Sequence, residues 1–238
     1  MTNWFPSEEW LAAYRTNLNG SDRYRRESEG WGVEFDGRFV FEIRRLPVEE
    51  TTLGEFPDEL SEGLGENLSN LPEERATALV EDAPETLRER TDYGDDGDDD
   101  RERLLGALFA TPIVELPDAV RPPLREEFPG DLANLLDQLE RYVEDGTVRV
   151  YLDLRDGNCR EAEVLEPGDE RDVGFVLRGD YPEWKNLTEG ADVMGAVLGE
   201  HLDLDGSVTT VMNYADAADE MGVVASRIES ASLFVADS

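Results

Sequence analysis

Lysine is almost absent from this chain. Lys185 is the only lysine among 22 basic residues, and 57 acidic residues give a formal net charge of -35. The acidic residues are spread along the whole chain, whereas acidic tails come as a block. This composition is typical of salt-accumulating halophiles, in which a Debye length of about 3 Å at 1 M salt screens the self-repulsion of the protein. We therefore expect a halophilic protein whose acidic surface reflects its surroundings more than its partners.

A basic surface patch is also missing. Arg23, Arg25 and Arg26 form the densest run of arginines, and acidic residues lie directly beside them. Nucleic-acid binding requires a basic surface, so we expect no nucleic-acid partner. An anionic membrane surface repels such a chain except at high salt, so we expect at most transient membrane contact.

Cysteine and long apolar runs are scarce. The single Cys159 excludes an internal disulfide and a cysteine zinc site. The longest uninterrupted apolar stretch, Leu104 to Ala110, is too short to span a bilayer. The first five residues lack the basic segment of a secretory signal. The sequence thus predicts a soluble, cytoplasmic protein.

Two unique residues raise the possibility of nucleophilic catalysis. Cys159 follows a predicted hairpin turn and His201 begins a short polar strand, so the two are expected on different sheet edges. Nucleophilic catalysis also needs a third, orienting group and a pocket. We reject this pair, and the sequence gives no catalytic residue, so we expect a protein that is not an enzyme.

Two loop motifs also lack the residues that their chemistry needs. The acidic segment from Asp92 to Arg103 has Gly94 at the third position of a calcium loop and Arg103 where the bidentate glutamate belongs. Gly63-Leu64-Gly65 does not follow a strand, as a dinucleotide-binding loop would. We therefore expect no metal site and no cofactor.

Hydrophobic periodicity predicts helices and strands at both ends of the chain. Ser7 is a plausible N-cap of a helix that Asn19-Gly20 ends. Apolar residues from Trp31 to Ile43 alternate with polar ones and predict a strand, bent or bulged at Gly37. Residues 47–146 carry helical stripes instead, the strongest from Leu132 to Val143.

Strand patterns return after residue 146. Alternation over 148–154 is followed by the turn signal Asp156-Gly157, a return strand and a further strand over 173–177. Two short helices over 180–188 and 192–198, a strand at 202–204 and one final helix over 208–228 follow. This order predicts an α+β fold with an antiparallel sheet and one helical face. The domain boundaries expected are 1–46 and 147–238 for the two parts of this fold and 47–146 for an acidic helical insertion.

Several segments resemble the sterol carrier protein type 2 family. The likeness covers about Trp4 to Ile43 and Thr147 to Ile228. The segments that carry it are Trp10…Tyr14…Asn17…Tyr24…Trp31 before an aromatic strand, Leu152-x-Leu154-x-Asp156-Gly157-x-Cys159, Phe175-Val176-Leu177, Tyr181-x-x-Trp184-x-x-Leu187-x-x-Gly190 and Gly199-x-x-Leu202-x-Leu204-x-Gly206. The resemblance implies a roughly five-stranded, mainly antiparallel sheet covered by helices.

The resemblance also implies an apolar tunnel between the sheet and the helices. It implies non-catalytic binding or intracellular transfer of a hydrophobic ligand, which is a lipid, isoprenoid or acyl chain. The residues that the resemblance places at the ligand are Phe175, Leu177, Trp184, Leu187, Met194, Val197, Leu198, Met212 and Met221.

Two other hypotheses account for the same apolar stripes. From periodicity alone these residues form an ordinary protein core. The second hypothesis is a non-catalytic accessory subunit that uses the same fold to bind a partner protein. An exposed apolar patch on the helix from Leu132 to Val143 would favour it.

The acidic composition generates a prediction about salt. Dialysis from molar KCl into dilute buffer should loosen the structure, because the carboxylates are then no longer screened from one another. Circular dichroism and thermal melting at a series of salt concentrations measure the effect. An unchanged spectrum and melting temperature in dilute buffer would refute the halophile interpretation.

Overall fold

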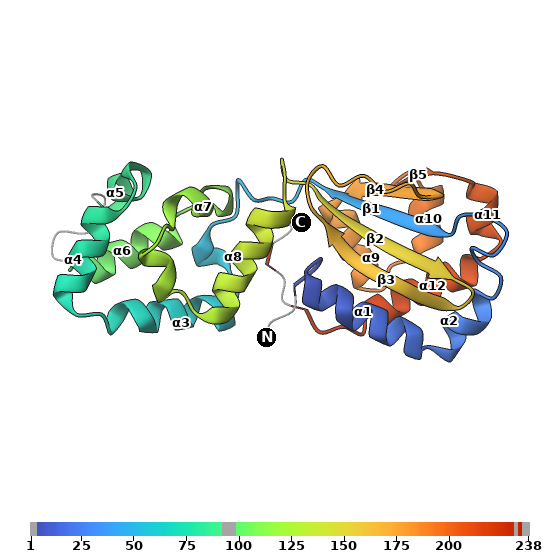
Figure 1. Ribbon diagram of the computed structural model, residues 1–238, viewed down its shortest axis with the longest axis horizontal. Coiled ribbons are helices and arrows are strands. Elements are labelled where there is room, and N and C mark those ends of the chain that lie inside the picture. Colours follow the sequence, from blue (N-terminus) through green and yellow to red (C-terminus); the bar gives the residue numbers. More distant parts are fainter. Residues whose placement is uncertain (1–3, 92–98, 231–232, 235–238) are drawn as a thin grey trace. The chain divides into compact units, whose positions relative to one another are not determined.

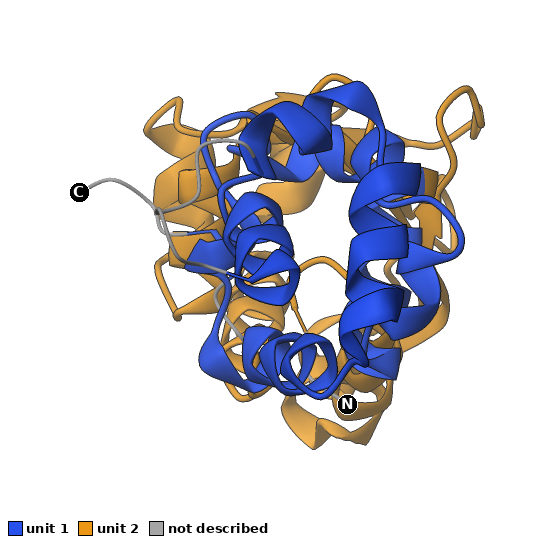
Figure 2. Ribbon diagram, turned by 90° about the vertical axis from the view of Figure 1, so that its left-hand side faces the viewer, with its two compact units in different colours: residues 1–2, 47–140, 231–238 blue, residues 3–46, 141–230 orange. Residues whose placement is uncertain are grey.

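A computed structural model describes residues 4–91, 99–230 and 233–234 (Figure 1). The chain divides into two compact units, coloured in Figure 2. One unit, here called the sheet unit, contains residues 4–46 and 141–230. The other, the helical unit, contains residues 47–140 together with Leu233 and Phe234. Each unit has its own buried apolar core.

The sheet unit is built on five strands in the order β3-β2-β1-β4-β5 (Figure 1). Their bounds are β1 Arg38–Arg44, β2 Val148–Arg155, β3 Asn158–Leu165, β4 Phe175–Asp180 and β5 Asp203–Asp205. The pairs β1–β2, β2–β3 and β4–β5 are antiparallel, and β1–β4 is parallel. The predicted α+β class with a mainly antiparallel, five-stranded sheet is therefore confirmed.

The hairpin between β2 and β3 forms where the Asp-Gly pair predicts it. Asp156 and Gly157 both have positive φ, 48° and 77°, as a type I′ turn requires. A Cβ atom on residue 157 would lie 2.9 Å from the carbonyl oxygen of Arg25. Glycine at this position therefore permits both the turn and the close approach of α2, Asp22–Glu27.

The central strand β1 pairs with β2 although about 100 residues separate the two. Ile43 lies opposite Val148 in the antiparallel register. Just beyond that pair, the Leu46 N–H donates to the Gly146 carbonyl at 2.8 Å. The segment between β1 and β2 thus leaves the sheet and returns to it at adjacent points, so the sheet is continuous.

Helices cover one face of this sheet (Figure 1). They are α1 Glu8–Gly20, α2 Asp22–Glu27, α9 Tyr181–Thr188, α10 Val193–Leu198, α11 Val208–Met212 and α12 Ala215–Ala225. Ser7 caps α1 as predicted, because its hydroxyl accepts from the Trp10 N–H at 3.0 Å. Trp10 and Tyr14 are buried on the same side of α1 as Leu18. α1 therefore presents the predicted apolar stripe inward.

Two elements differ from the sequence prediction. Residues 31–37 form a turn, a bend and irregular backbone before β1, and Gly32 has a φ of 69°, which interrupts an extended strand. The single helix predicted over 208–228 is two helices that break at Asn213 and Tyr214. The Tyr214 ring packs edge-on against Trp31 with ring centroids 5.2 Å apart. The break between the two helices therefore lies against the segment that precedes β1.

The opposite face of the sheet carries a small apolar cluster and charged side chains. Val40, Tyr151 and Leu165 are buried together there. Arg178 lies 3.8 Å from a carboxylate oxygen of Glu42. Residues of β1, β2 and β4 thus alternate between this face and the helix-covered face, as the predicted period of two requires.

The helical unit contains α3 Asp58–Ser69, α4 Glu73–Asp82, α5 Glu85–Thr91, α6 Asp100–Phe109, α7 Leu116–Ala119 and most of α8 Gly130–Tyr142. Short 3₁₀ turns span Leu53–Glu55, Ile113–Glu115 and Leu124–Glu127. Leucines such as Leu64, Leu68 and Leu108 are fully buried in its core. The described part of the chain has no helix both long and apolar enough to cross a membrane.

A glycine before β4 offers a test of the packing in the sheet unit. A Cβ on residue 174 would lie 2.0 Å from the Asp36 carbonyl oxygen, so Gly174→Ala should destabilise the protein by about 1–3 kcal/mol. Gly20→Ala is the matched control, because apart from its chain neighbours and the backbone of its own helix no atom lies within 4 Å of the added Cβ. Thermal melts at high salt measure both, and equal melting temperatures would contradict the prediction.

Candidate functional site

An apolar cavity lies between the sheet and the helices of the sheet unit. Side chains on the helix-covered face form one wall. They are Phe39, Phe41 and Ile43 of β1, Val150 and Leu152 of β2, Leu177 of β4 and Leu204 of β5. Four of the five strands therefore contribute to this wall.

The helices form the opposite wall. Trp10, Leu11 and Tyr14 come from α1, Trp184 and Leu187 from α9, Val193 and Val197 from α10, Val211 from α11, and Ala218, Met221 and Ala225 from α12. Among the described residues, no charged side chain lines the cavity. The wall is therefore suited to hydrocarbon and unsuited to an ion.

The volume of the cavity is about 100 Å³. That is the order of the roughly 150 Å³ cavity that accepts a benzene ring in an engineered protein core. Sites that enclose a whole small molecule measure roughly 300–1,000 Å³. The cavity accommodates a segment of a slender chain, whereas a fused-ring molecule requires the lining side chains to move.

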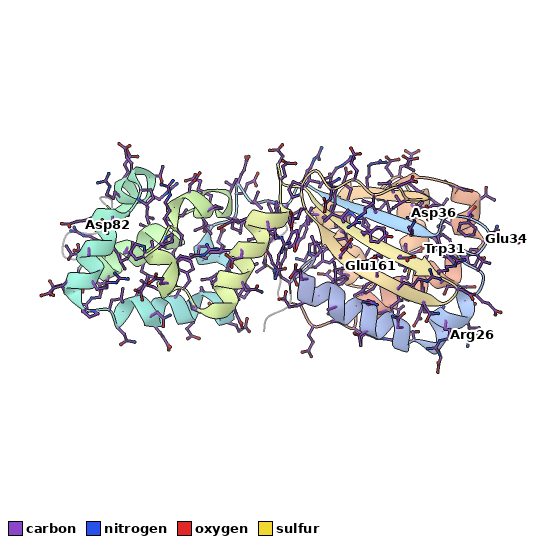
Figure 3. All side chains as sticks on the ribbon, in the orientation of Figure 1. Arg26, Trp31, Glu34, Asp36, Asp82 and Glu161 are labelled. Atoms are coloured by element: carbon purple, nitrogen blue, oxygen red, sulfur yellow. The ribbon has the colours of Figure 1, made fainter. Side chains whose placement is uncertain are left out.

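An aromatic cluster lies beside the cavity at the end of the sheet where β1 begins. Trp31, labelled in Figure 3, stacks on Phe39 with ring centroids 5.6 Å apart, and its ring lies 5.1 Å from that of Phe175. Its indole N–H donates to the Gly37 carbonyl at 2.8 Å, which fixes the ring orientation. A smaller void of about 40 Å³ is lined in part by Trp31 and Tyr214 and shares Phe39, Val211, Ala218 and Met221 with the main cavity.

Five of the nine residues that the resemblance places at the ligand line the cavity. They are Leu177, Trp184, Leu187, Val197 and Met221. Trp184 is 5% exposed, and its ring lies 4.9 Å from that of Phe41. The structure thus brings these five together, and their contact with a ligand stays a prediction.

The other four predicted residues lie off the cavity wall. Phe175 packs in the aromatic cluster, and Met194 is buried outside the lining. Leu198 is the last residue of α10 and 58% exposed, and Met212 is the last residue of α11 and 52% exposed. α10 lines the cavity through Val193 and Val197, and α11 lines it through Val211, so Leu198 and Met212 each follow a lining residue and lie on the adjacent side of the helix.

Sequence reasoning did not assign several lining residues to the site. Trp10 and Tyr14 belong to a recognised helical stripe, and Phe41 and Val150 belong to recognised strand alternations. These patterns identify an inward face but not which part of that face adjoins a void. The pairing of β1 with β2, distant in sequence, decides that.

Cys159 and His201 lie at opposite sides of the sheet. Cys159 is buried in β3, one edge strand, and its thiol donates to the Glu161 carbonyl at 3.3 Å. Burial raises the pKa of this thiol to about 12. His201 precedes β5, the other edge strand, and its Nδ1 lies 3.5 Å from a carboxylate oxygen of Glu183. The two residues cannot act as a nucleophile and its base.

The described residues hold no cluster of three or more histidine, cysteine or acidic side chains placed to bind a metal ion. Residues 92–98 of the calcium-loop candidate lie outside the described part of the chain. Asp99 within that segment caps α6 by accepting from the Arg101 and Glu102 N–H groups.

Comparison with known protein families gives no match, and comparison with curated proteins gives none either. Two solved structures are similar to the chain. A crystal structure of sterol carrier protein 2 is 19% identical at a TM-score of 0.47, with 93% of this chain and 97% of that chain covered. A conserved hypothetical protein from Thermus thermophilus, described as possibly a sterol carrier protein, is 18% identical at a TM-score of 0.46, with 94% and 89% covered. Neither similarity is strong enough to identify a function for this chain.

The environment of Cys159 predicts an unreactive thiol. A thiol with a pKa of about 12 stays protonated at pH 8, and only the thiolate reacts with disulfide reagents. Modification of the folded protein at high salt should be at least about a hundredfold slower than modification in denaturant. Fast labelling of the folded protein at pH 8 would contradict this environment.

Proposed function

We propose that the protein binds a hydrophobic chain, of the lipid, isoprenoid or acyl type, in the apolar cavity of the sheet unit. The observation that carries the proposal is the cavity itself, which is walled on both sides by apolar side chains. This is also the type of site that the sequence resemblance implies. Binding or transfer, without covalent chemistry, is the proposed activity.

Apolar burial supplies the driving force. Each methylene transferred from water into such a site contributes about 0.8 kcal/mol, so a segment of several methylenes offsets part of the entropy lost on binding. Salts that are excluded from apolar surface strengthen this contribution. High salt therefore favours both the acidic fold and the proposed binding.

The dimensions favour a slender chain over a sterol. A volume of about 100 Å³ holds only part of a long chain, so a longer ligand must displace side chains along the wall. Met221 lines the cavity, and its flexible thioether side chain adapts to irregular shapes at a lower energy than a branched residue. α10 contributes Val193 and Val197 from a helix of only six residues, which makes it a suitable element to move.

The accessory-subunit alternative gains no support from α8. Its apolar residues Leu132, Leu135, Leu136 and Leu139 are buried, each at most 6% exposed. The exposed apolar patch that would favour a partner-binding role is therefore absent from that described helix.

A cavity-filling variant tests the proposal. Ala218 lines the cavity, so Ala218→Leu should weaken binding of diphenylhexatriene, a slender apolar fluorophore, by about tenfold or more at high salt. Ala12→Leu is the matched control, because Ala12 lies on the exposed side of α1. Circular dichroism verifies that both variants fold, and Val197→Phe is the second filling variant.

Two results would overturn the proposal. One is wild-type protein that does not bind the fluorophore at any concentration. The other is equal binding by the filling variants and the Ala12→Leu control. Where binding is found, mass spectrometry of organic extracts from the purified protein identifies the chain that it carries.

A further inference from the structure

Two polar side chains on α1 give the apolar cavity one place that is chemically different. Only four of the described lining side chains carry a nitrogen or oxygen atom, and these are Trp10, Tyr14, Trp184 and Thr188. Sites for small molecules are largely apolar and use a few placed polar groups to orient the ligand. A group among these four that lacks a hydrogen-bond partner in the protein can bond to the ligand instead. Its chemistry therefore indicates which polar group the ligand carries.

Two of the four groups are not available to a ligand. The Thr188 hydroxyl donates to the Lys185 carbonyl at 2.8 Å. The Trp184 indole N–H is buried without a partner, but its nitrogen lies 3.2 Å from the position that a Cβ on Gly179 would occupy, and Leu202 crowds that same position. Neither Gly179 nor Leu202 lines the cavity, so this N–H faces the backbone of β4.

Trp10 lines the cavity together with Phe5, whose ring packs edge-on against it with centroids 4.8 Å apart. The Trp10 side chain is 4% exposed, and its indole N–H has no hydrogen-bond partner. The Trp4 indole N–H is also buried and unpaired, but Trp4 does not line the cavity. A buried donor without an acceptor destabilises the protein by about 1–3 kcal/mol.

Tyr14 lies directly beside Trp10. The two residues are one turn apart on α1, and their rings stack with centroids 5.1 Å apart and an angle of 13°. The Tyr14 hydroxyl lies 3.5 Å from the Met221 carbonyl, the outer limit of a hydrogen bond. Burial raises the pKa of this hydroxyl well above its usual value, so it stays protonated as a donor. The α1 side of the cavity therefore carries one donor without an acceptor, the Trp10 N–H, and beside it a hydroxyl with one long hydrogen bond.

We infer that the ligand carries a neutral carbonyl oxygen, as in a ketone, ester or quinone, that accepts from Trp10 and Tyr14 while its hydrocarbon part fills the cavity. This inference rests on the proposed function. A carboxylate fits less well, because no charged side chain among the described residues lines the cavity to compensate for its buried charge. A plain hydrocarbon leaves the Trp10 N–H unpaired.

A comparison of two matched ligands tests the inference. Dodecan-2-one and dodecane are titrated against wild type, Trp10→Phe and Trp4→Phe at high salt, with displacement of diphenylhexatriene as the readout. The ratio of the two affinities should fall about five- to tenfold in Trp10→Phe, the equivalent of one neutral hydrogen bond. The hydration of each ligand cancels in this comparison because the same ligands are used throughout.

Trp4→Phe is the matched control. It also removes one buried, unpaired indole N–H, but Trp4 does not line the cavity, so the ratio should stay as in wild type. Tyr14→Phe, which removes a single oxygen, is the second test variant and should lower the ratio in the same direction. It remains informative if Trp10→Phe does not fold.

The outcomes separate the inference from the function on which it rests. If both ligands bind and the ratio is the same in wild type, Trp10→Phe and Tyr14→Phe, the carbonyl assignment is overturned and chain binding stands. If neither ligand binds to wild type, the proposed function and the carbonyl inference are both overturned. Tighter binding of dodecanoate than of dodecan-2-one at pH 8 would overturn the inference that the ligand's polar group is uncharged.

Discussion

The antiparallel pairing of β1 with β2 is the constraint on which the rest of the sheet unit depends. β1 is the central strand, with β2 on one side and the parallel strand β4 on the other. Phe39, Phe41 and Ile43 stand on its helix-covered side and form the middle of the cavity wall. If β1 were not paired on both sides, the sheet would be split in two and the wall would have no centre.

The hydrogen bond from Leu46 to Gly146 explains how the sheet tolerates a long insertion. It joins the two ends of the segment directly beyond the last strand pair, Ile43 and Val148. Loop-closure entropy grows only slowly with length, so about 100 residues between paired strands are tolerated. The helical unit has a leucine core of its own.

Local signals predicted most of the fold. The Ser7 cap, the α1 stripe and the Asp156-Gly157 turn all act within a few residues and appear as predicted. The errors lie where a distant contact overrides a local pattern. Trp31 turns away from a strand to pack on Phe175, and Tyr214 breaks a helix to pack on Trp31.

The candidate site was less predictable than the fold, for a related reason. Periodicity shows that Met212 and Leu198 lie on apolar stripes, but it does not show that each ends its helix and is exposed. It also does not show that Trp10 lies across a void from β1, because that depends on pairings between residues far apart in the sequence. The groups around the indole N–H of Trp10 and of Trp184 cannot be predicted from sequence, because they depend on atomic positions in the folded protein.

The central place of β1 also sets an order of events during synthesis. At about 5–20 residues per second, β2 emerges roughly 5–20 s after β1, and β4 emerges later still. During that interval Phe39 and Phe41 have no strand beside them, and such apolar segments aggregate readily. Leu233 and Phe234, which are buried and belong to the helical unit, emerge after all of its helices. β1 is therefore the part of the sheet that is open to aggregation until β2 pairs with it.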